Sequence, residues 1–503
     1  MTDSAPDSET RPADHDGNWR ARAGLLLGPL IFLGFLLVPP PGAFTPDAWL
    51  VLGITLFMAT WWISEALPLP VTALLPIALL PVLGVVPMHE ATAPYANPII
   101  FLFMGGFAIA LAVQRWDLHR RMALAILTRS GNRLHRLVGA FMLATAGLSM
   151  WVSNTATAAL MLPIALSVLA LIEQGARPDG QGVSAESRRP ALALLLGIAF
   201  AANIGGMATI IGSPPNALTV AYLSDRHGID IGFVQWMTLG LPLAASLLLL
   251  AWFLLTRWVF PVHRVELNGL GELLAEQRDR VGAWSPAEKR VAGVFLLVAL
   301  AWLNRPLLDA WLPIQLTDAG IAILGAGLLF LIPSGSGEQR RLLAWDNTRD
   351  LPWGVLLLVG GGLSLGSAIE SSGLAELAAD ALTAAQAWPL LLVMGGVVLV
   401  TMTLSHVTSN TATAATLLPL VVALAQRMDV PVLLLALPVA FAASVAFMLP
   451  VATPPNAIVF ASNRLRVPDM IRGGALLSAV AVVLVSLAVY ALAEPLLLQG
   501  SAE

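Results

Sequence analysis

Two identical heptapeptides decide the fold of this 503-residue chain. The sequence Ser-Asn-Thr-Ala-Thr-Ala-Ala runs from Ser153 to Ala159 and recurs letter for letter from Ser409 to Ala415. Each copy lies inside a long apolar block that contains no Lys, Arg, Asp or Glu. Irregular backbone at membrane depth is tolerated only where it is buried in protein or lines a cavity. Each heptapeptide therefore indicates a functional interruption of a membrane segment.

The heptapeptides belong to a longer internal repeat. Gly212–Ala217, with the sequence Gly-Ser-Pro-Pro-Asn-Ala, is echoed by Ala-Thr-Pro-Pro-Asn-Ala at Ala452–Ala457. Phe103–Gly106, which ends in Gly-Gly, is echoed by Leu358–Gly361. Three matches in the same order at a nearly constant offset indicate two copies of one structural unit.

The composition predicts an integral membrane protein. Hydrophobic residues make up 57% of the chain and charged residues only 12%, against about 25% charged residues in a soluble domain. A membrane span needs about 20 apolar residues, so the chain has room for many spans. The absence of cysteine excludes disulfides, thiol catalysis and iron–sulfur clusters. No basic run indicates a nucleic-acid partner.

Hydropathy and charge predict four regions: a flexible cytoplasmic tail at 1–23, a first repeat at 24–255, a cytoplasmic connection at 256–290 and a second repeat at 291–494. Within the first repeat we expect a re-entrant hairpin at 137–172 and an interrupted span at 191–223. Within the second repeat we expect a re-entrant hairpin at 388–427 and an interrupted span at 430–460.

Charge also predicts the orientation. Arg20 and Arg22 precede the first span and place the N-terminus in the cytoplasm. Arginines flank the first hairpin, whereas Glu370, Glu376 and Asp380 precede the second, so the two copies are expected to be inverted. Inverted repeats with broken helices are typical of alternating-access transporters. The short polar tail and the lack of a targeting sequence favour the bacterial inner membrane.

The interrupted spans predict an anion site. Ser213-Pro214 and Thr453-Pro454 are helix-start signals, with Ser or Thr at the N-cap and Pro at the first helical position. A half-helix that starts at mid-membrane points free N–H groups at its surroundings, and these attract anions. A lone Ser or Asn in a membrane helix usually makes a structural hydrogen bond between helices. Polar motifs that occur twice and in the same order favour a binding site. Gly105, Gly106 and Gly360–Gly362 are expected to be close-packing glycines.

The anion site is expected to need cations as well. The blocks 137–172 and 388–426 of the two hairpins and both interrupted spans contain no Lys or Arg, and a helix terminus supplies only about half a charge. Co-bound cations would supply the rest of the positive charge for a dianion. Sodium suits a site whose ligands are all oxygen atoms, whereas a proton would need a titratable carrier, for which these segments offer His406.

The paired Ser-Asn-Thr and Ser/Thr-Pro-Pro-Asn motifs resemble the divalent anion/sodium symporter family, and the likeness covers nearly the whole chain. The resemblance implies an all-α polytopic membrane protein, an inverted-repeat transporter with about eleven transmembrane helices and two re-entrant hairpins. It also implies a homodimer, with a scaffold domain and a transport domain in each protomer, that works by an elevator motion.

The resemblance also implies the site residues. A first sodium site would use Ser149, Ser153, Asn154 and Gly212. A second sodium site would use Ser405, Asn410 and Ala452. The substrate carboxylates would contact Asn154, Thr155, Ser213, Asn410, Thr411, Thr453 and Pro454.

The resemblance predicts sodium symport of a di- or tricarboxylate such as succinate, malate or fumarate, and no enzyme activity. The sequence departs from the family at His406, where many members carry an acid, and at Ser405, a position often held by Thr. A protonated His406 in place of a cation would give the alternative, a sodium-independent dicarboxylate exchanger. A sulfate transporter on the same fold is a further alternative.

Overall fold

A computed structural model describes residues 19–175, 185–262, 267, 269–311, 313, 315–336, 339–381 and 387–497. Residues 1–18 of the expected tail lie outside the described residues. Nearly all of the described chain is helical, which confirms the all-α class. The exception is a small antiparallel pair of strands, β1 (Pro333–Ser336) and β2 (Gln339–Arg341).

The described helices follow one another in the order of the two expected repeats. The first half contains α1 (Trp19–Leu37), α2 (Pro46–Ser64), α3 (Leu69–Thr72), α4 (Leu75–Val82), α5 (Met88–Thr92), η2 (Ala93–Ala96), α6 (Pro98–Arg115), α7 (Leu118–Leu127), α8 (Leu134–Ser149), α9 (Asn154–Gly175), α10 (Ala185–Gly206), α11 (Pro214–His227), α12 (Phe233–Phe253) and η3 (Leu254–Val259). The second half contains α13 (Leu270–Val281), α14 (Pro286–Leu303), α15 (Arg305–Trp311), α16 (Asp318–Leu331), η4 (Trp345–Asp350), α17 (Trp353–Ser371), α18 (Leu374–Ala381), α19 (Leu390–Ser405), α20 (Asn410–Arg427), α21 (Leu433–Ala443), η6 (Pro450–Ala452), α22 (Pro454–Phe460) and α23 (Val467–Leu497).

Eight helical segments of the described chain are long and apolar enough to cross a membrane, or nine if the bent pair α14–α15 counts as one span. Two of the eight segments lie in α9 of the first hairpin and α10 of the first interrupted span. The other described helices of the hairpins and interrupted spans fall outside this set. Several of them, including α8, α19 and α21, are apolar but shorter than a full span. A membrane segment that is broken in its middle gives two short helices, so the expected total of eleven spans stays a prediction.

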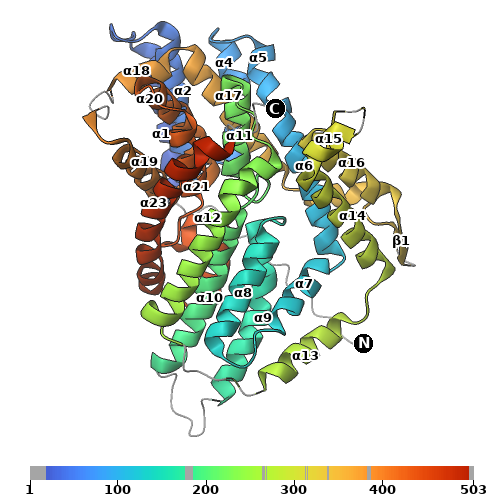
Figure 1. Ribbon diagram of the computed structural model, residues 1–503. Coiled ribbons are helices and arrows are strands. Elements are labelled where there is room, and N and C mark those ends of the chain that lie inside the picture. Colours follow the sequence, from blue (N-terminus) through green and yellow to red (C-terminus); the bar gives the residue numbers. More distant parts are fainter. Residues whose placement is uncertain are drawn as a thin grey trace, which may run out of the picture.

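Each heptapeptide marks the turn of a helical hairpin. Helix α8 ends at Ser149 and α9 begins at Asn154, while α19 ends at Ser405 and α20 begins at Asn410. Figure 1 shows α8 and α9 in the lower half of the molecule and α19 and α20 in the upper half. The hairpins thus lie toward opposite ends of the molecule, as expected for inverted copies.

The two predicted helix restarts are confirmed. Helix α11 begins at Pro214 with Ser213 as its N-cap, and α22 begins at Pro454 with Thr453 as its N-cap. The Thr453 hydroxyl accepts a hydrogen bond from the Asn456 amide at 3.4 Å. Non-helical backbone separates α10 from α11, and the short helix η6 is the only helical turn between α21 and α22. Both spans are therefore broken inside the protein.

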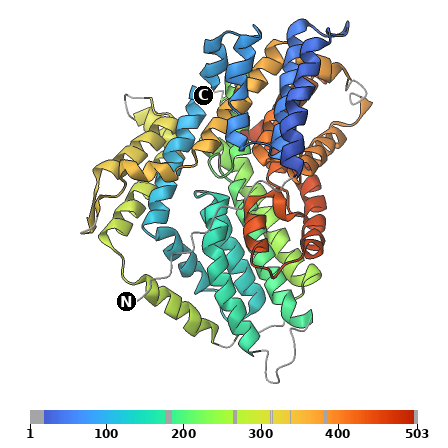
Figure 2. The ribbon, with the colours of Figure 1, turned by 180° about the vertical axis from the view of Figure 1, so that it is seen from behind.

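Close-packing glycines hold the helices together. A Cβ atom on Gly105 would lie 2.5 Å from the carbonyl carbon of Ala322 on α16, and one on Gly361 would overlap the Ala73 carbonyl oxygen. Figure 2 shows α6 (light blue) beside the yellow helices that include α16. Gly106 differs from the expectation, because its nearest neighbour would be the Ile211 side chain at 3.4 Å.

A partly buried ion pair joins α7 to the start of α14 and to the polar connection before it. The Arg121 Nε donates to Glu288 Oε1 at 2.9 Å, and the Arg121 Nη1 donates to the Gly282 carbonyl at 3.0 Å. The Glu288 carboxylate also accepts from the Ser285 amide at 2.7 Å, which completes a capping box at the start of α14. Hydropathy does not predict this contact between α7 and the start of α14.

Replacing Arg121 with alanine is expected to destabilise the protein by about 3–5 kcal/mol, because it leaves the buried Glu288 carboxylate without its partner. Thermal unfolding of the detergent-purified protein measures the effect. Arg280→Ala is the matched control, since Arg280 pairs with Glu276 on an exposed helix face and both side chains are more than half exposed. Equal losses in the two variants would contradict the role of the Arg121–Glu288 pair.

Candidate functional site

The N-cap of each broken span contacts the other broken span, and the region of these contacts is called the central site below. The Ser213 Oγ lies 3.2 Å from the Ser444 Oγ, and the Asn203 Nδ2 donates to the Thr453 Oγ1 at 3.0 Å. All four side chains are buried. Asn203 lies in the last turn of α10, and Ser444 directly follows α21. Each pair therefore joins the N-cap of one repeat to the end of the helix that precedes the break in the other repeat. The start of α11 is therefore held to the end of α21, and the start of α22 to the end of α10, by polar contacts across the repeats.

A buried asparagine stabilises each break. The Asn216 Nδ2 donates to two backbone carbonyls, those ten and seven residues before it, at 2.9 and 2.8 Å. Asn456 makes the same two bonds to the carbonyls ten and seven residues before it, at 3.0 and 2.9 Å. Backbone carbonyls freed by a break inside the membrane need such partners. The asparagine of each Pro-Pro-Asn motif is thus the clamp of the unwound segment.

Three of the four residues expected at the first sodium site converge. The Ser149 hydroxyl donates to the Ala202 carbonyl at 2.7 Å and contacts the Asn154 amide. With its Nδ2 turned toward them, Asn154 donates to the carbonyl oxygens of Ala202 at 3.1 Å and Gly212 at 3.3 Å. The tip of the first hairpin and the first broken span therefore share one cluster of oxygen atoms.

Ser153 does not join this cluster by any hydrogen bond of the described residues. Its hydroxyl accepts from the Ala156 amide at 3.3 Å, as an N-terminal cap of α9 does. Thr155 on α9 and Pro454 on α22 are exposed, whereas Thr411 is buried. The residues expected to bind substrate thus include both buried side chains and side chains that a ligand can contact.

The second expected sodium site has unpaired oxygen atoms. Ser405 ends α19 and Asn410 begins α20, so they flank the tip of the second hairpin. The buried Ser405 Oγ and Asn410 Oδ1 have no hydrogen-bond partner among the described residues. Ala452, the third expected ligand, is buried in η6 beside the second break. Unpaired buried oxygens are costly unless something binds them.

The comparison with protein families decides the class of this protein. Residues 20–498 match the family described as the sodium:sulfate symporter transmembrane region. The chain belongs to this family. The match covers most of the chain and agrees with the membrane spans, so the predicted resemblance to sodium-coupled anion symporters is confirmed. The protein is an integral membrane transporter and not an enzyme.

Similar curated proteins carry a more specific name. The chain is 39% identical over 477 residues to a sodium-dependent dicarboxylate transporter, SdcS, of Staphylococcus saprophyticus. The aligned region covers 94% of this chain and 92% of that protein. It is 38% identical over 470 residues to the SdcS protein of Staphylococcus aureus strain USA300, and this alignment covers 93% of this chain and 90% of that protein.

Two solved structures share the fold at low sequence identity. The Alcanivorax borkumensis YdaH transporter matches with a TM-score of 0.54 and 13% identity, over 87% of this chain and 97% of that one. Neisseria gonorrhoeae MtrF, described as one of a class of antimetabolite efflux pumps, matches with a TM-score of 0.57 and 12% identity, over 93% of this chain and 94% of that one. At this identity the likeness concerns the fold alone.

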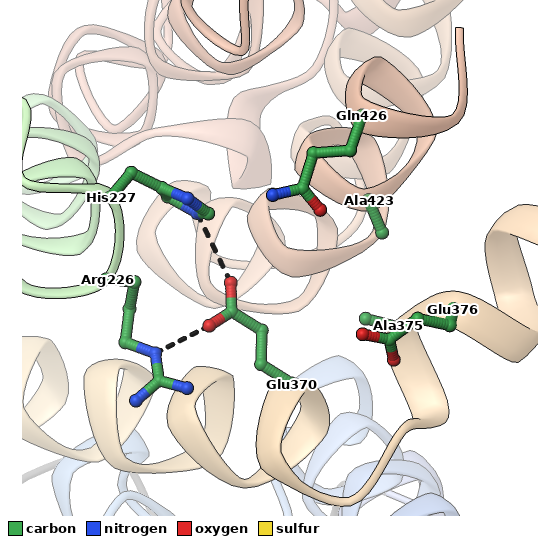
Figure 3. Close-up of a pocket in the computed structure, with 7 residues that line it drawn as sticks. All are labelled: Arg226, His227, Glu370, Ala375, Glu376, Ala423 and Gln426. Atoms are coloured by element: carbon green, nitrogen blue, oxygen red, sulfur yellow. Dashed lines mark hydrogen bonds and ion pairs between the residues drawn. The ribbon is translucent and has the colours of Figure 1, made fainter. Parts of the chain in front are cut away.

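A polar cavity of about 260 Å³ lies at the other end of α11 in this member of the sodium:sulfate symporter family. Its lining residues come from α11, α17, α18 and α20: Arg226, His227, Glu370, Ala375, Glu376, Ala423 and Gln426. Figure 3 shows Glu370 between Arg226 and His227, at 2.5 Å from the Arg226 Nε and 3.3 Å from the His227 Nε2.

This cavity is separate from the central site. Helix α11 has 14 residues, so Ser213 and His227 lie about 20 Å apart along it. The carboxylate of Glu370 also accepts from the Tyr222 hydroxyl. Its negative charge is thus already paired, and the cluster links α11 to α17 rather than offering an open anion site.

Sequence reasoning missed Asn203 and Ser444. Each is a single polar residue in an apolar stretch outside the repeated motifs, and such residues usually serve packing. The signal that would have found them is their place near the end of the helix that precedes each break. In this symporter they are the partners of Thr453 and Ser213 across the repeats.

Proposed function

We propose that this protein imports small dicarboxylate anions, of the succinate, malate and fumarate class, together with sodium. The observation that carries the proposal is a central site built from broken helices and neutral oxygen and nitrogen groups. The four segments that form it contain no Lys and no Arg other than Arg427, the last residue of the second hairpin. Such a site attracts an anion but does not neutralise a dianion. The names of the similar Staphylococcus proteins support the same substrate and coupling ion.

The anion would bind between the tips and the breaks. The N-termini of α11 and α22 would offer the positive ends of their helix dipoles rather than free N–H groups, because each helix begins with two prolines. The Ser213 and Thr453 hydroxyls stand at these two ends as the N-caps. The side-chain amides of Asn154 and Asn410, with the Thr155 and Thr411 hydroxyls, come from the two hairpin tips. The exposed position of Thr155 and Pro454 gives the substrate access to this set.

Sodium would bind to the oxygen clusters beside the anion. Ser149, Ser153, Asn154 and Gly212 would bind one ion, with the Asn154 amide turned so that its Oδ1 and not its Nδ2 faces the ion. Ser405, Asn410 and Ala452 would bind a second. Two bound sodium ions add the positive charge that the helix termini lack. Because both clusters lie where a hairpin tip meets a broken span, binding of the ions would order the same residues that hold the anion.

The transport cycle would move the site as a unit. The polar contacts between the breaks and the hairpin tips favour an elevator motion in which these elements travel together. We place the protein as a homodimer in the bacterial inner membrane with its N-terminus in the cytoplasm. Light scattering in detergent, corrected for bound detergent, should then give twice the chain mass of 53.0 kDa.

Uptake of labelled succinate into proteoliposomes tests the function. We expect uptake that requires an inward sodium gradient and does not require succinate inside. Liposomes that carry the Asn216→Ala variant serve as the inactive control. Uptake that ignores sodium but requires internal succinate would establish the exchanger instead. Competition by unlabelled sulfate stronger than that by malate or fumarate would move the substrate class to sulfate.

A further inference from the structure

His406 lies at the tip of the second hairpin, directly after α19, and is buried. Its Nδ1 lies 2.7 Å from the Met402 carbonyl oxygen, and the Met448 amide donates to its Nε2 at 3.1 Å. A carbonyl oxygen only accepts and a backbone amide only donates. Nδ1 therefore carries the hydrogen and Nε2 presents its lone pair, which is a neutral imidazole with both nitrogens in use.

The two bonds of His406 join different elements. Met402 belongs to α19 of the hairpin, whereas Met448 belongs to the unwound segment between α21 and α22. The imidazole thus connects the hairpin tip to the second broken span, shortly before Ala452. A side chain that links these two elements controls how the tip sits on the break.

The first repeat makes the corresponding link with other residues. Met150 corresponds to His406, because each stands three residues before the heptapeptide. The Thr209 hydroxyl donates to the Met150 carbonyl at 2.6 Å and accepts from the Gly212 amide at 3.0 Å. In the first repeat a hydroxyl on the break therefore reaches the hairpin tip.

The second repeat lacks that hydroxyl. Thr209 and Leu449 correspond, because each supplies the carbonyl seven residues before the clamping asparagine. Leucine cannot make the bond that Thr209 makes. In the second repeat it is instead the side chain of the tip, His406, that reaches the break, where its Nε2 accepts from the Met448 amide. From the first repeat to the second, Thr is thus replaced by Leu on the break, and Met is replaced by His on the hairpin tip.

The link lies beside unpaired oxygen atoms. Ser405 precedes His406, and Asn410 follows it by four residues across the non-helical tip. The Ser405 Oγ and Asn410 Oδ1 are the buried oxygens described above, which have no partner among the described residues. An oxygen pair of this kind suits a cation, and its spacing depends on how the tip is held. Since both ring nitrogens already have partners, the imidazole has no N–H left to bind these oxygens.

We propose that His406 is a positioning residue that latches the second hairpin tip to the broken span and so shapes the second sodium site. It acts as a neutral hydrogen-bonding group and does not stand in for the cation. This inference rests on the proposed sodium symport. It assigns the departure from the family pattern at His406 to the geometry of the tip, not to a loss of sodium coupling.

The test transplants the link of the first repeat into the second. His406→Met removes the latch, and the double variant His406→Met with Leu449→Thr restores a hydroxyl on the break, as in the Met150–Thr209 pair. His406→Gln is the conservative variant, because its amide oxygen can accept from the Met448 amide. The readouts are the sodium concentration that half-activates succinate uptake and the succinate KM at saturating sodium.

We expect His406→Met to raise the half-activating sodium concentration about tenfold, the effect of losing a buried hydrogen bond. The succinate KM at saturating sodium should stay within about threefold of the wild type. His406→Gln and the double variant should recover most of the sodium affinity. Sodium-dependent protection against thermal unfolding of the purified protein should follow the same order.

The outcomes separate this inference from the proposed function. Sodium-dependent uptake in the wild type with an unchanged sodium requirement in His406→Met would overturn the latch alone. Sodium-independent uptake in the wild type would overturn both. If His406→Met does not fold, the double variant decides: a folded and sodium-activated double variant supports the latch, and no recovery overturns it.

Discussion

Replacing Asn216 with alanine is expected to lower the rate of succinate uptake by at least about thirtyfold. The variant leaves two buried carbonyl oxygens of the first break without their donor, and each unpaired buried group costs about 1–3 kcal/mol. Two such costs correspond to a loss of about thirtyfold or more in the population of a correctly shaped site. The initial rate in proteoliposomes, corrected for folded protein, measures the effect.

Asn216→Asp sharpens this test, because the aspartate has nearly the same volume but no N–H donor. Its carboxylate would face two carbonyl oxygens, so we expect a larger loss than in the alanine variant. Asn456→Ala should repeat the result in the second break. Asn304→Ala is the matched control, since the Asn304 Nδ2 donates to the Leu300 carbonyl in an exposed hydrogen bond within one helical turn. Normal uptake by Asn216→Ala would show that the break does not need its clamp.

The duplicated motifs made the central architecture predictable. A polar tripeptide in a charge-free block indicates a turn inside the membrane, and Ser-Pro or Thr-Pro indicates a helix start, because few other structures satisfy the backbone there. The hairpin tips and both N-caps follow from these rules. The sequence also indicated the family, because the motifs occur twice and in order.

Other features depended on partners that the sequence does not pair. The latch of His406 needs the Met448 amide, which is 42 residues away along the chain. Asn203 finds Thr453 from 250 residues away. Single polar residues in apolar helices give no signal for such pairs, since their partners are set by the way the repeats pack. The tight contact at Gly105 and the loose one at Gly106 are equally a property of the packing, because the two letters are identical.

Alanine substitutions at the adjacent residues Gly105 and Gly106 are expected to have opposite effects on the stability of the protein. An alanine Cβ at position 105 would lie 2.5 Å from the Ala322 carbonyl carbon, a backbone atom that cannot move aside without shifting α16. Overpacking of this kind costs about 1–3 kcal/mol, and sometimes more. We therefore expect Gly105→Ala to lower both the yield of folded protein and its midpoint of thermal unfolding in detergent.

Gly106→Ala should leave the yield unchanged or raise the unfolding midpoint slightly. Its Cβ would meet only the flexible Ile211 side chain at 3.4 Å, and alanine favours the helix over glycine by about 0.5–1 kcal/mol. Adding Ala322→Gly to Gly105→Ala should restore little, because the closest contact is to backbone that the added glycine still carries. Full recovery in that double variant would mean that the Ala322 methyl group, and not the approach of the two helix backbones, makes position 105 require glycine.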